Sequence, residues 1–461
     1  MYIEHLHVSG VKLLHDLDVD FLKPDGGLKK WTVVIGRNGT GKTSVLQAIA
    51  LAAIGARQVN NLAEPILDHV RDRRDAGAPL AVKARFSFSD RARELDIFPG
   101  LTPPAPASLR VESTVKLSPA GSLLSATSRY EGLVGAAASE TDPLAAARDQ
   151  QHKLWFVAGY GPARHLPPSE FQAQLKFPYL DRLRPLFDPR APITSTAFVN
   201  HFGKPEDPDV EAGRRSTKAN MYSRVLQKAL FQNETLLPLL QGIELRGRDG
   251  VKTTSSFQES ARIIQNIGHE SCKLPAVSLA HGHQSMIAWI ADLVGHVILE
   301  ANQEIEPEGM EGLVLIDELD LYLHPTWQVV LVRALKETFR AMQFVVTTHS
   351  PLVLASLDPN DDQVLRLVQN ADTGHVEGHL QTHDPRLLTA SELLQRYFDL
   401  EDLHPDPIGR MVHDYCYLAS NPYRRDEDDI QLALWRQTLA QVGIDPHYEP
   451  VERREFRRGA P

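Results

Sequence analysis

The stretch VVIGRNGTGKTSVLQAIA, residues 33–50, opens with β-branched residues, passes through a glycine-rich turn and ends in an apolar run. Gly36, Gly41, Lys42 and Thr43 fit the pattern G-x-x-x-x-G-K-[ST]. A turn of this kind directs successive backbone N–H groups into one concavity, and the N-terminus of the following helix adds its positive end. The segment therefore predicts a strand, a phosphate-binding loop and a helix.

This loop supplies most of the predicted nucleotide ligands. We expect Lys42 to reach the β- and γ-phosphates as a catalytic residue, and the Thr43 hydroxyl to bind Mg²⁺. A glycine turn that arises by chance is the alternative, and the strand and helix patterns on either side argue against it. The residues predicted to bind ATP here are Gly36, Arg37, Asn38, Gly39, Thr40, Gly41, Lys42, Thr43 and Ser44.

A second apolar strand ends in two adjacent carboxylates. It lies in LVLIDELDLYLHPTWQ, residues 313–328, and the carboxylates are Asp317 and Glu318. We expect Asp317 to bind Mg²⁺ through water and Glu318 to polarise the water that attacks the γ-phosphate. Acidic residues are also common in turns after strands. The Walker B interpretation therefore depends on the phosphate loop being present as well.

A third strand, in FVVTTHSPLVL at residues 344–354, ends at Thr347, Thr348 and His349. Ligands of open parallel sheets bind beyond the carboxyl ends of the strands, so we expect His349 on the same rim as Lys42. An isolated histidine is most often structural. Together with the other two motifs, however, this one favours a catalytic histidine that contacts the γ-phosphate.

These motifs carry a family resemblance. GRNGTGKT, LIDELD and TTHSP resemble the ABC-type ATPases of the structural-maintenance-of-chromosomes (SMC) and recombination branch, including the ATPase part of OLD-family nucleases. GYGPAR (159–164), LAHGHQS (279–285), DLYLHPTWQ (320–328) and TTHSPLVL resemble more narrowly the bacterial AAA-family ATP-binding proteins with an ABC-type core. Many of those proteins belong to anti-phage systems. The resemblance covers roughly residues 1–390 and implies an α/β ABC-type ATPase head, with a mixed sheet around the P-loop and an antiparallel β subdomain.

The resemblance also implies a signature segment that contacts the nucleotide of the opposite subunit. Residues 279–283 match it and make Gly282 a predicted nucleotide ligand, although Ala280 replaces the serine of the family. A glycine cap before a buried helix is the alternative for this segment. Arg164 stands where such a head places its Gln-bearing loop, and it is either a γ-phosphate contact or a surface ion-pair residue.

The chain is predicted to divide into four parts. The parts are 1–164 (N-terminal half of the head with the P-loop and the antiparallel β subdomain), 165–275 (a mostly helical insertion), 276–385 (C-terminal half with the signature-like segment, Walker B and His349) and 386–461 (a helical extension and candidate partner-binding part). Alternation of apolar and polar residues predicts strands in 2–21, 81–89 and 108–118, whereas the Ala/Ser-rich 119–150 is expected to form loops or turns.

Composition and net charge limit the kinds of partner that we expect the protein to bind. No apolar stretch approaches the roughly 20 residues that span a bilayer, and the N-terminus lacks a signal-peptide pattern, so we expect a cytoplasmic protein without a membrane partner. A net charge of -10 argues against a globally basic nucleic-acid surface. One local basic cluster comprises Arg214, Arg215, Lys218, Arg224 and Lys228. A solvated helix face is the favoured interpretation of this cluster, and contact with DNA is the alternative.

The function predicted from the sequence is an ATPase that uses ATP and Mg²⁺ and releases ADP and phosphate. ATP binding is expected to gate a homodimer or higher assembly, which a separately encoded effector protein reads in anti-phage defence. One alternative is a DNA-repair or recombination ATPase that binds DNA directly, and a second is the ATPase subunit of an ABC importer. Residues 386–461 lack the second carboxylate cluster that a TOPRIM nuclease domain would need.

Overall fold

The computed structural model describes residues 1–72, 74, 79–88, 110–118, 123–131, 142–144, 155–166, 175, 177–191, 193, 198, 201–202, 217–245, 261–267, 270–301, 303–400 and 406–453. These residues fall into two compact units, Met1–Leu393 and Leu394–Pro461, and each is described by itself. Arg214, Arg215 and residues 454–461 lie outside the described residues.

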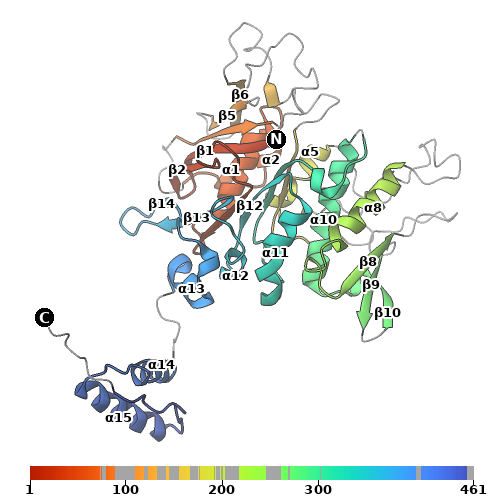
Figure 1. Ribbon diagram of the computed structural model, residues 1–461. Coiled ribbons are helices and arrows are strands. Elements are labelled where there is room, and N and C mark those ends of the chain that lie inside the picture. Colours follow the sequence, from red (N-terminus) through yellow and green to blue (C-terminus); the bar gives the residue numbers. More distant parts are fainter. Residues whose placement is uncertain are drawn as a thin grey trace. The chain divides into compact units, whose positions relative to one another are not determined.

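Unit 1 is organised around one large mixed sheet (Figure 1). Within the described residues the strand order is β6-β5-β4-β1-β2-β14-β13-β3-β12-β11-β7. The strands are β1 (Tyr2–Val11), β2 (Leu14–Asp20), β3 (Trp31–Gly36), β4 (Ala81–Ser87), β5 (Arg110–Leu117), β6 (Leu124–Tyr130), β7 (Val157–Tyr160), β11 (Gly312–Ile316), β12 (Met342–Thr347), β13 (Asp362–Gln369) and β14 (Val376–Leu380). The predicted fold class, an α/β head with a mixed sheet and an antiparallel β part, is confirmed by this order.

Five neighbouring strands, β7, β11, β12, β3 and β13, pair in parallel. Ile316 pairs with Val346 on one side and with Tyr160 on the other, so the last residues of these strands lie level with one another. The loops that follow β3, β7, β11 and β12 therefore leave the sheet at one common edge. This edge carries the three sequence motifs.

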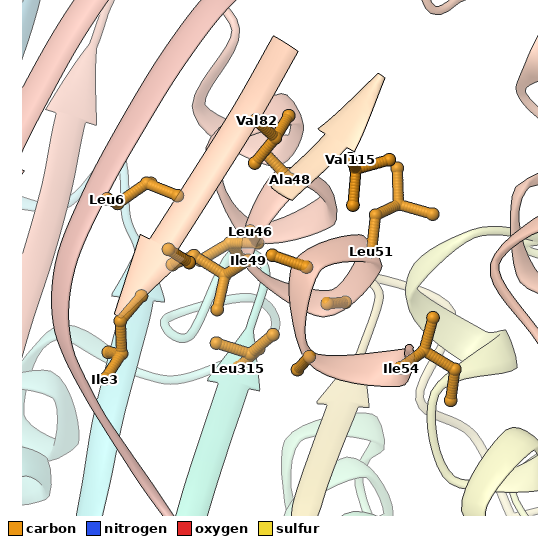
Figure 2. Packing of buried hydrophobic residues seen from close by; sticks show 14 of the residues in the cluster. Ile3, Leu6, Leu46, Ala48, Ile49, Leu51, Ile54, Val82, Val115 and Leu315 are labelled. Atoms are coloured by element: carbon orange, nitrogen blue, oxygen red, sulfur yellow. The ribbon is translucent and has the colours of Figure 1, made fainter. Parts of the chain in front are cut away.

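The sheet curves around helix α1 (Lys42–Ile54), which follows the phosphate-binding loop. The helix contacts β4 and β5 near one end of the strand order and β7 and β12 near the other. Figure 2 shows Leu46, Ile49 and Ile54 of α1 among side chains from four strands. Because nearly every residue of α1 is buried, its sequence is apolar on all faces rather than on one stripe.

Two expectations from the sequence need correction. The segment 119–150 was expected to form loops, but Leu124–Tyr130 forms strand β6, whose Leu124, Ala126 and Tyr130 point inward at alternate positions. The segment 165–275 also contains more than helices. It holds a three-stranded antiparallel sheet of β8 (Leu240–Leu245), β9 (Ala261–Ile267) and β10 (Glu270–Pro275). The three β-branched isoleucines of ARIIQNI were the available signal for β9.

Besides α1, six helices within the described residues are nine or more residues long. They are α8 (Thr217–Phe231), α10 (His281–Glu300), α11 (Pro325–Thr338), α13 (Ala390–Phe398), α14 (Pro407–Ala419) and α15 (Asp426–Gln441), and the short ones are α2 (Val59–Ala63), α5 (Pro178–Asp181) and α12 (Pro351–Leu354). A capping box precedes α13, because Glu392 N–H donates to Thr389 Oγ1 and Thr389 N–H donates to Glu392 Oε2. In unit 2, α14 and α15 pack through Tyr415, Ala419 and Leu432.

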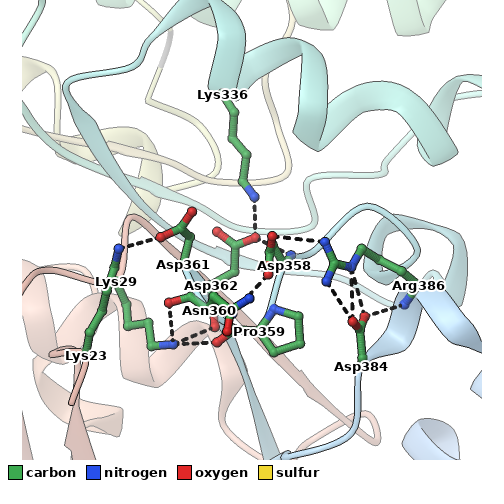
Figure 3. Close-up of polar contacts among 10 residues, drawn as sticks. All are labelled: Lys23, Lys29, Lys336, Asp358, Pro359, Asn360, Asp361, Asp362, Asp384 and Arg386. Atoms are coloured by element: carbon green, nitrogen blue, oxygen red, sulfur yellow. Dashed lines mark hydrogen bonds and ion pairs between the residues drawn. The ribbon is translucent and has the colours of Figure 1, made fainter. Parts of the chain in front are cut away.

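The turn before β13 is held by cationic side chains (Figure 3). Lys29 Nζ donates to Pro359 O at 2.6 Å and to Asn360 O at 3.2 Å. Lys336 pairs with Asp362, whose side chain is almost completely buried, whereas Lys23 pairs with the exposed Asp361. These contacts fasten the start of β13, at the edge of the sheet opposite the motifs.

Candidate functional site

The phosphate-binding loop adopts backbone conformations that favour glycine. Gly39 has φ 84° and Gly41 has φ 89°, both in the left-handed region, and Lys42 begins α1 directly after them. Gly36 is required for a close approach, because a Cβ there would lie 2.7 Å from Leu367 O and 2.6 Å from Thr40 Oγ1. The sequence pattern therefore corresponds to real constraints on the backbone.

Lys42 points back into this loop. Its Nζ donates to Gly36 O at 2.9 Å and to Arg37 O at 3.1 Å, and 7% of the residue is exposed. Burial lowers the pKa of the Lys42 ammonium group, and the carboxylates of Asp317 and Glu318 oppose that shift. A cation held by two carbonyls at the mouth of a nest of N–H groups is suited to bind phosphate.

The other predicted loop ligands differ in exposure. Arg37, Asn38 and Gly39 are exposed at the turn, whereas Thr40 is buried and its Oγ1 donates to Arg37 O at 2.9 Å. Ser44 is also buried, in the first turn of α1. Among these residues, backbone N–H groups and exposed side chains are thus the parts available to a ligand.

Asp317 brings the three motifs together. Its Oδ2 accepts a hydrogen bond of 2.7 Å from Thr43 Oγ1, and its Oδ1 accepts one of 2.6 Å from Thr347 Oγ1. The Asp317 N–H donates to Tyr160 O at 2.8 Å, so β7 holds the end of β11. The structure therefore places the two predicted Mg²⁺ ligands, Thr43 and Asp317, in direct contact.

Glu318 has a strained backbone. Its φ is 51°, in the left-handed region that non-glycine residues rarely adopt. The Glu318 N–H donates to Thr347 Oγ1 at 2.7 Å, and the next amide, Leu319 N–H, donates to Thr347 O at 2.9 Å. Thr347, which has no role predicted from the sequence, thus links the Asp317 carboxylate and the backbone of Glu318 and Leu319 to β12.

Arg164 is buried, so its interpretation as a surface ion-pair residue is wrong. Only 2% of the residue is exposed, and burial lowers the pKa of its guanidinium group to about 10. Nη1 donates to Gly161 O at 2.9 Å and to Asp317 O, and Nη2 donates to Glu318 O at 2.7 Å. Its terminal nitrogens therefore contact main-chain carbonyls directly behind the carboxylates.

His349 is exposed after β12, at the edge that carries the other motifs. The loop around it is held by Asp320, whose Oδ1 accepts hydrogen bonds from Thr348 Oγ1 and, at 3.4 Å, from the His349 N–H. Asp320 and Thr348 were not predicted as site residues. The available signal was the last acidic residue of DELD, which follows the strand by only a few positions.

The signature-like segment forms the start of α10. Ala280 is the N-cap residue and makes no side-chain capping bond. Gly282 is tightly packed, because a Cβ there would lie 2.5 Å from Tyr322 O in the loop after Glu318. His281 and His165 both lie near the Tyr322 ring, with centroid distances of 6.0 Å and 5.6 Å. This close packing supplies a structural reason for the glycine that does not depend on nucleotide.

The oxygen ligands at this edge of the sheet are of the kind that binds Mg²⁺. Thr43 and Asp317 offer a hydroxyl and a carboxylate, and Mg²⁺ in such sites takes one or two protein oxygens together with water and phosphate oxygens. Among the described residues, no group of three or more His, Cys, Asp or Glu side chains could hold a metal ion by itself. A metal bound jointly with a polyphosphate is therefore the kind that this edge suits.

The basic face of α8 is neutralised within the chain. Arg224 pairs with Glu304 and Glu306, and Lys228 pairs with Glu306 and Glu308. Lys218, the third described member of the predicted basic cluster, donates to Leu299 O at 3.0 Å. No helix among the described residues has the length and apolar character needed to cross a membrane.

Two family models match the chain. One is described as "AAA domain, putative AbiEii toxin, Type IV TA system" and matches residues 185–355, and the other is described as "AAA domain" and matches residues 5–95. The first match includes the signature-like, Walker B and His349 segments, and the second includes the phosphate-binding loop. Together with the relatives described next, these matches confirm the resemblance to ABC/SMC-type P-loop ATPases.

Curated relatives span the same region. The chain is 22% identical to the Septu protein PtuA of Bacillus mycoides (strain KBAB4) over 459 residues, which is 98% of this chain and 53% of that protein. It is 36% identical over 178 residues to the Retron Ec83 probable ATPase of Escherichia coli, which is 38% of this chain and 30% of that protein. The chain thus spans about half the length of the first relative and less of the second.

Solved structures of SMC heads are also similar. An SMC head bound to the C-terminal winged-helix domain of ScpA is 16% identical, with a TM-score of 0.49 over 84% of this chain and 99% of that one. The SMC head domain from Thermotoga maritima is 14% identical, with a TM-score of 0.42 over 83% of this chain and 100% of that one.

Proposed function

We propose that the chain binds ATP with Mg²⁺ and hydrolyses it to ADP and phosphate. The observation that carries the proposal is the contact between Thr43 of the phosphate-binding loop and Asp317 of the Walker B strand, with Glu318 at the next position. A lysine, a hydroxyl and two carboxylates thus converge at one edge of a parallel sheet. P-loop ATPases use this set of groups for phosphoryl transfer to water.

Each residue has a role that its position supports. Lys42 and the N–H groups of the loop bind the β- and γ-phosphates, and Thr43 and Asp317 hold Mg²⁺, which neutralises charge on the phosphates. Glu318 orients the attacking water and accepts its proton. His349 contacts the γ-phosphate from the neighbouring strand. ATP hydrolysis at such a site depends on the positions and charges of the groups around the γ-phosphate. Holding these groups in one geometry therefore raises the rate of hydrolysis.

We further propose that nucleotide closes a dimer. In this arrangement the segment Leu279–His283 of one copy lies against the nucleotide of the other, and Gly282 contributes a backbone N–H at the start of α10. Binding and closure are then coupled, so the nucleotide state becomes a conformational signal. Arg164 belongs to the site through the Walker B turn rather than as a ligand of ATP.

The signal is read by a separate effector protein in anti-phage defence. This part of the proposal is supported by the motif resemblance and by similarity to proteins named as Septu and retron components. Direct DNA binding is less favoured, because Arg224 and Lys228 of α8 are paired with carboxylates of the same chain. The helical unit 394–461 is a candidate contact for the effector.

The test uses two variants of the full chain. Lys42→Ala is expected to lose ATP binding, whereas Glu318→Gln is expected to keep binding and to lose turnover by about 10²- to 10⁴-fold. Light scattering should show dimers of Glu318→Gln with ATP and monomers with ADP. Turnover by Glu318→Gln at the parent rate would refute the catalytic role of Glu318, and the absence of any ATP-dependent dimer would refute the switch.

A further inference from the structure

Arg164 is a buried cation of unit 1 that contacts the Walker B turn from behind its carboxylates. Arg164 follows a tight turn after β7. A side chain does not fit at Gly161 in this turn, because a Cβ there would lie 2.2 Å from Pro185 O. The Arg164 side chain then passes behind the Walker B strand. Its guanidinium group donates to the carbonyls of Gly161, Asp317 and Glu318.

The two Walker B carbonyls flank the strained residue. Asp317 O precedes Glu318 in the chain and Glu318 O follows its Cα, so the guanidinium group binds the peptide group on each side of that Cα. The guanidinium group is planar and its N–H groups point in fixed directions, so its hydrogen bonds restrict the rotation of both peptide groups. A left-handed φ of 51° at a glutamate is unfavourable by itself and persists where surrounding contacts enforce it.

We propose that Arg164 is a positioning residue that holds Glu318 in its left-handed conformation and thereby aims the Glu318 carboxylate at the attacking water. The inference rests on the proposed ATPase function and deepens it. Thr347 fixes the same turn from the opposite strand through the Glu318 N–H. With the turn fixed at its N–H and at both carbonyls, the backbone sets the direction of the Glu318 Cα–Cβ bond, from which the side chain extends.

This role predicts an effect on turnover without an effect on binding. In Arg164→Lys, a single ammonium group replaces the guanidinium group and cannot bind all three carbonyls at once. We expect kcat to fall roughly 10- to 100-fold, as small displacements of catalytic groups do, while the affinity for ATP stays within about two-fold. A γ-phosphate contact would instead weaken the binding of ATP relative to ADP.

A double-mutant cycle with Glu318→Gln tests whether Arg164 acts through Glu318. If it does, Arg164→Lys costs little further turnover once Glu318 has lost its carboxylate. An equal cost in both backgrounds would overturn the proposal, because it would assign Arg164 an independent role. Arg182→Lys is the matched control, since Arg182 is fully buried and donates to the carbonyls of Val157 and Trp155 on the same strand segment, away from the site. We expect this control to lower the melting temperature and to keep turnover per folded molecule.

Hydrogen exchange provides a readout that needs no turnover. We expect Arg164→Lys, and Arg164→Gln as a second variant if the first does not fold, to speed exchange at the amides of Glu318 and Leu319, whereas Arg182→Lys leaves them protected. Unchanged protection of these two amides would overturn the proposal. A parent protein without ATP turnover would refute the proposed function instead, and the exchange data would still decide whether Arg164 holds the turn.

Discussion

The Thr43 hydroxyl donates a hydrogen bond of 2.7 Å to Asp317 Oδ2, although 274 positions of sequence separate the two residues. Thr43 lies in the first turn of α1, and Asp317 follows β11. Strand β12 lies between β3 and β11 and supplies Thr347, which binds the other carboxylate oxygen. The site therefore depends on the order of strands in the sheet as much as on the motifs.

The Thr43–Asp317 contact leads to a prediction about Mg²⁺. Thr43→Ala should raise the Mg²⁺ concentration needed for half-maximal ATP turnover by roughly ten-fold or more, because it removes one of two protein oxygens. Thr43→Ser keeps the hydroxyl and should stay near the parent. Turnover measured across Mg²⁺ concentrations at saturating ATP compares them. Equal Mg²⁺ dependence of Thr43→Ala and the parent would contradict the assignment.

Thr347 is predicted to matter through its hydroxyl. Thr347→Val keeps the shape of the buried side chain but leaves the Glu318 N–H without its acceptor, a loss that costs about 1–3 kcal/mol. We expect a lower melting temperature together with reduced turnover. Thr347→Ser keeps the hydroxyl, so its melting temperature and turnover should stay near those of the parent. A Thr347→Val protein as active and stable as Thr347→Ser would mean that the link between the Asp317 carboxylate and the Glu318 N–H has no consequence.

Ala280→Ser tests the signature-like segment. A hydroxyl that binds the partner's γ-phosphate contributes about 1.5–3 kcal/mol, and with two sites at half that strength the ATP-bound dimer becomes about 10- to 100-fold tighter. Light scattering of Glu318→Gln with and without Ala280→Ser, over a range of concentrations, measures this change.

The N-cap position of Ala280 requires a control for that experiment. A serine at an N-cap also stabilises its own helix by about 1 kcal/mol, whatever nucleotide is present. Thermal unfolding without nucleotide and dimerisation with ADP therefore accompany the ATP measurement. Tightening that appears equally with ADP, or does not appear with ATP, would count against placing this segment at a shared nucleotide.

Lys336→Ala is predicted to destabilise unit 1. It leaves the buried carboxylate of Asp362 without its cation, at a cost of about 3–5 kcal/mol near neutral pH. Lys23→Ala is the matched control, because its partner Asp361 is largely exposed and such pairs contribute about 1 kcal/mol or less (Figure 3). Urea unfolding at neutral pH distinguishes the two variants.

The cost of Lys336→Ala should also depend on pH. Burial already raises the pKa of Asp362 above its ordinary value, and loss of Lys336 raises that pKa further. A carboxyl whose pKa is higher in the folded state stabilises the fold below its unfolded pKa of about 3.9, and this contribution is lost as pH rises through the folded pKa. The stability gap between Lys336→Ala and the parent should therefore narrow as pH falls toward 4. A gap that is independent of pH would show that Asp362 is not its origin.

Much of the site was predictable because its chemistry is local in sequence. Gly36, Gly41, Lys42 and Thr43 lie within eight positions, and the need for left-handed glycines and a following helix can be recognised from residue types alone. The helical spacing of Met286, Ile290, Leu293 and Val297 similarly predicts α10. Strand β6 and the small sheet of β8–β10 were missed, since short alternating polar strands carry a weak signal between loops.

The sequence by itself determined the type of site: a phosphate-binding loop, a carboxylate pair after a buried strand and a histidine after another. Only the tertiary structure decided which groups touch. Arg164 has a strongly basic side chain and no local pattern that indicates burial, so its contacts with Asp317 O and Glu318 O emerge only when β7 pairs with β11. The same holds for Thr347, because hydrogen bonds between neighbouring strands depend on strand order and register. Neither the strand order nor the register can be read from the spacing of residues along the chain.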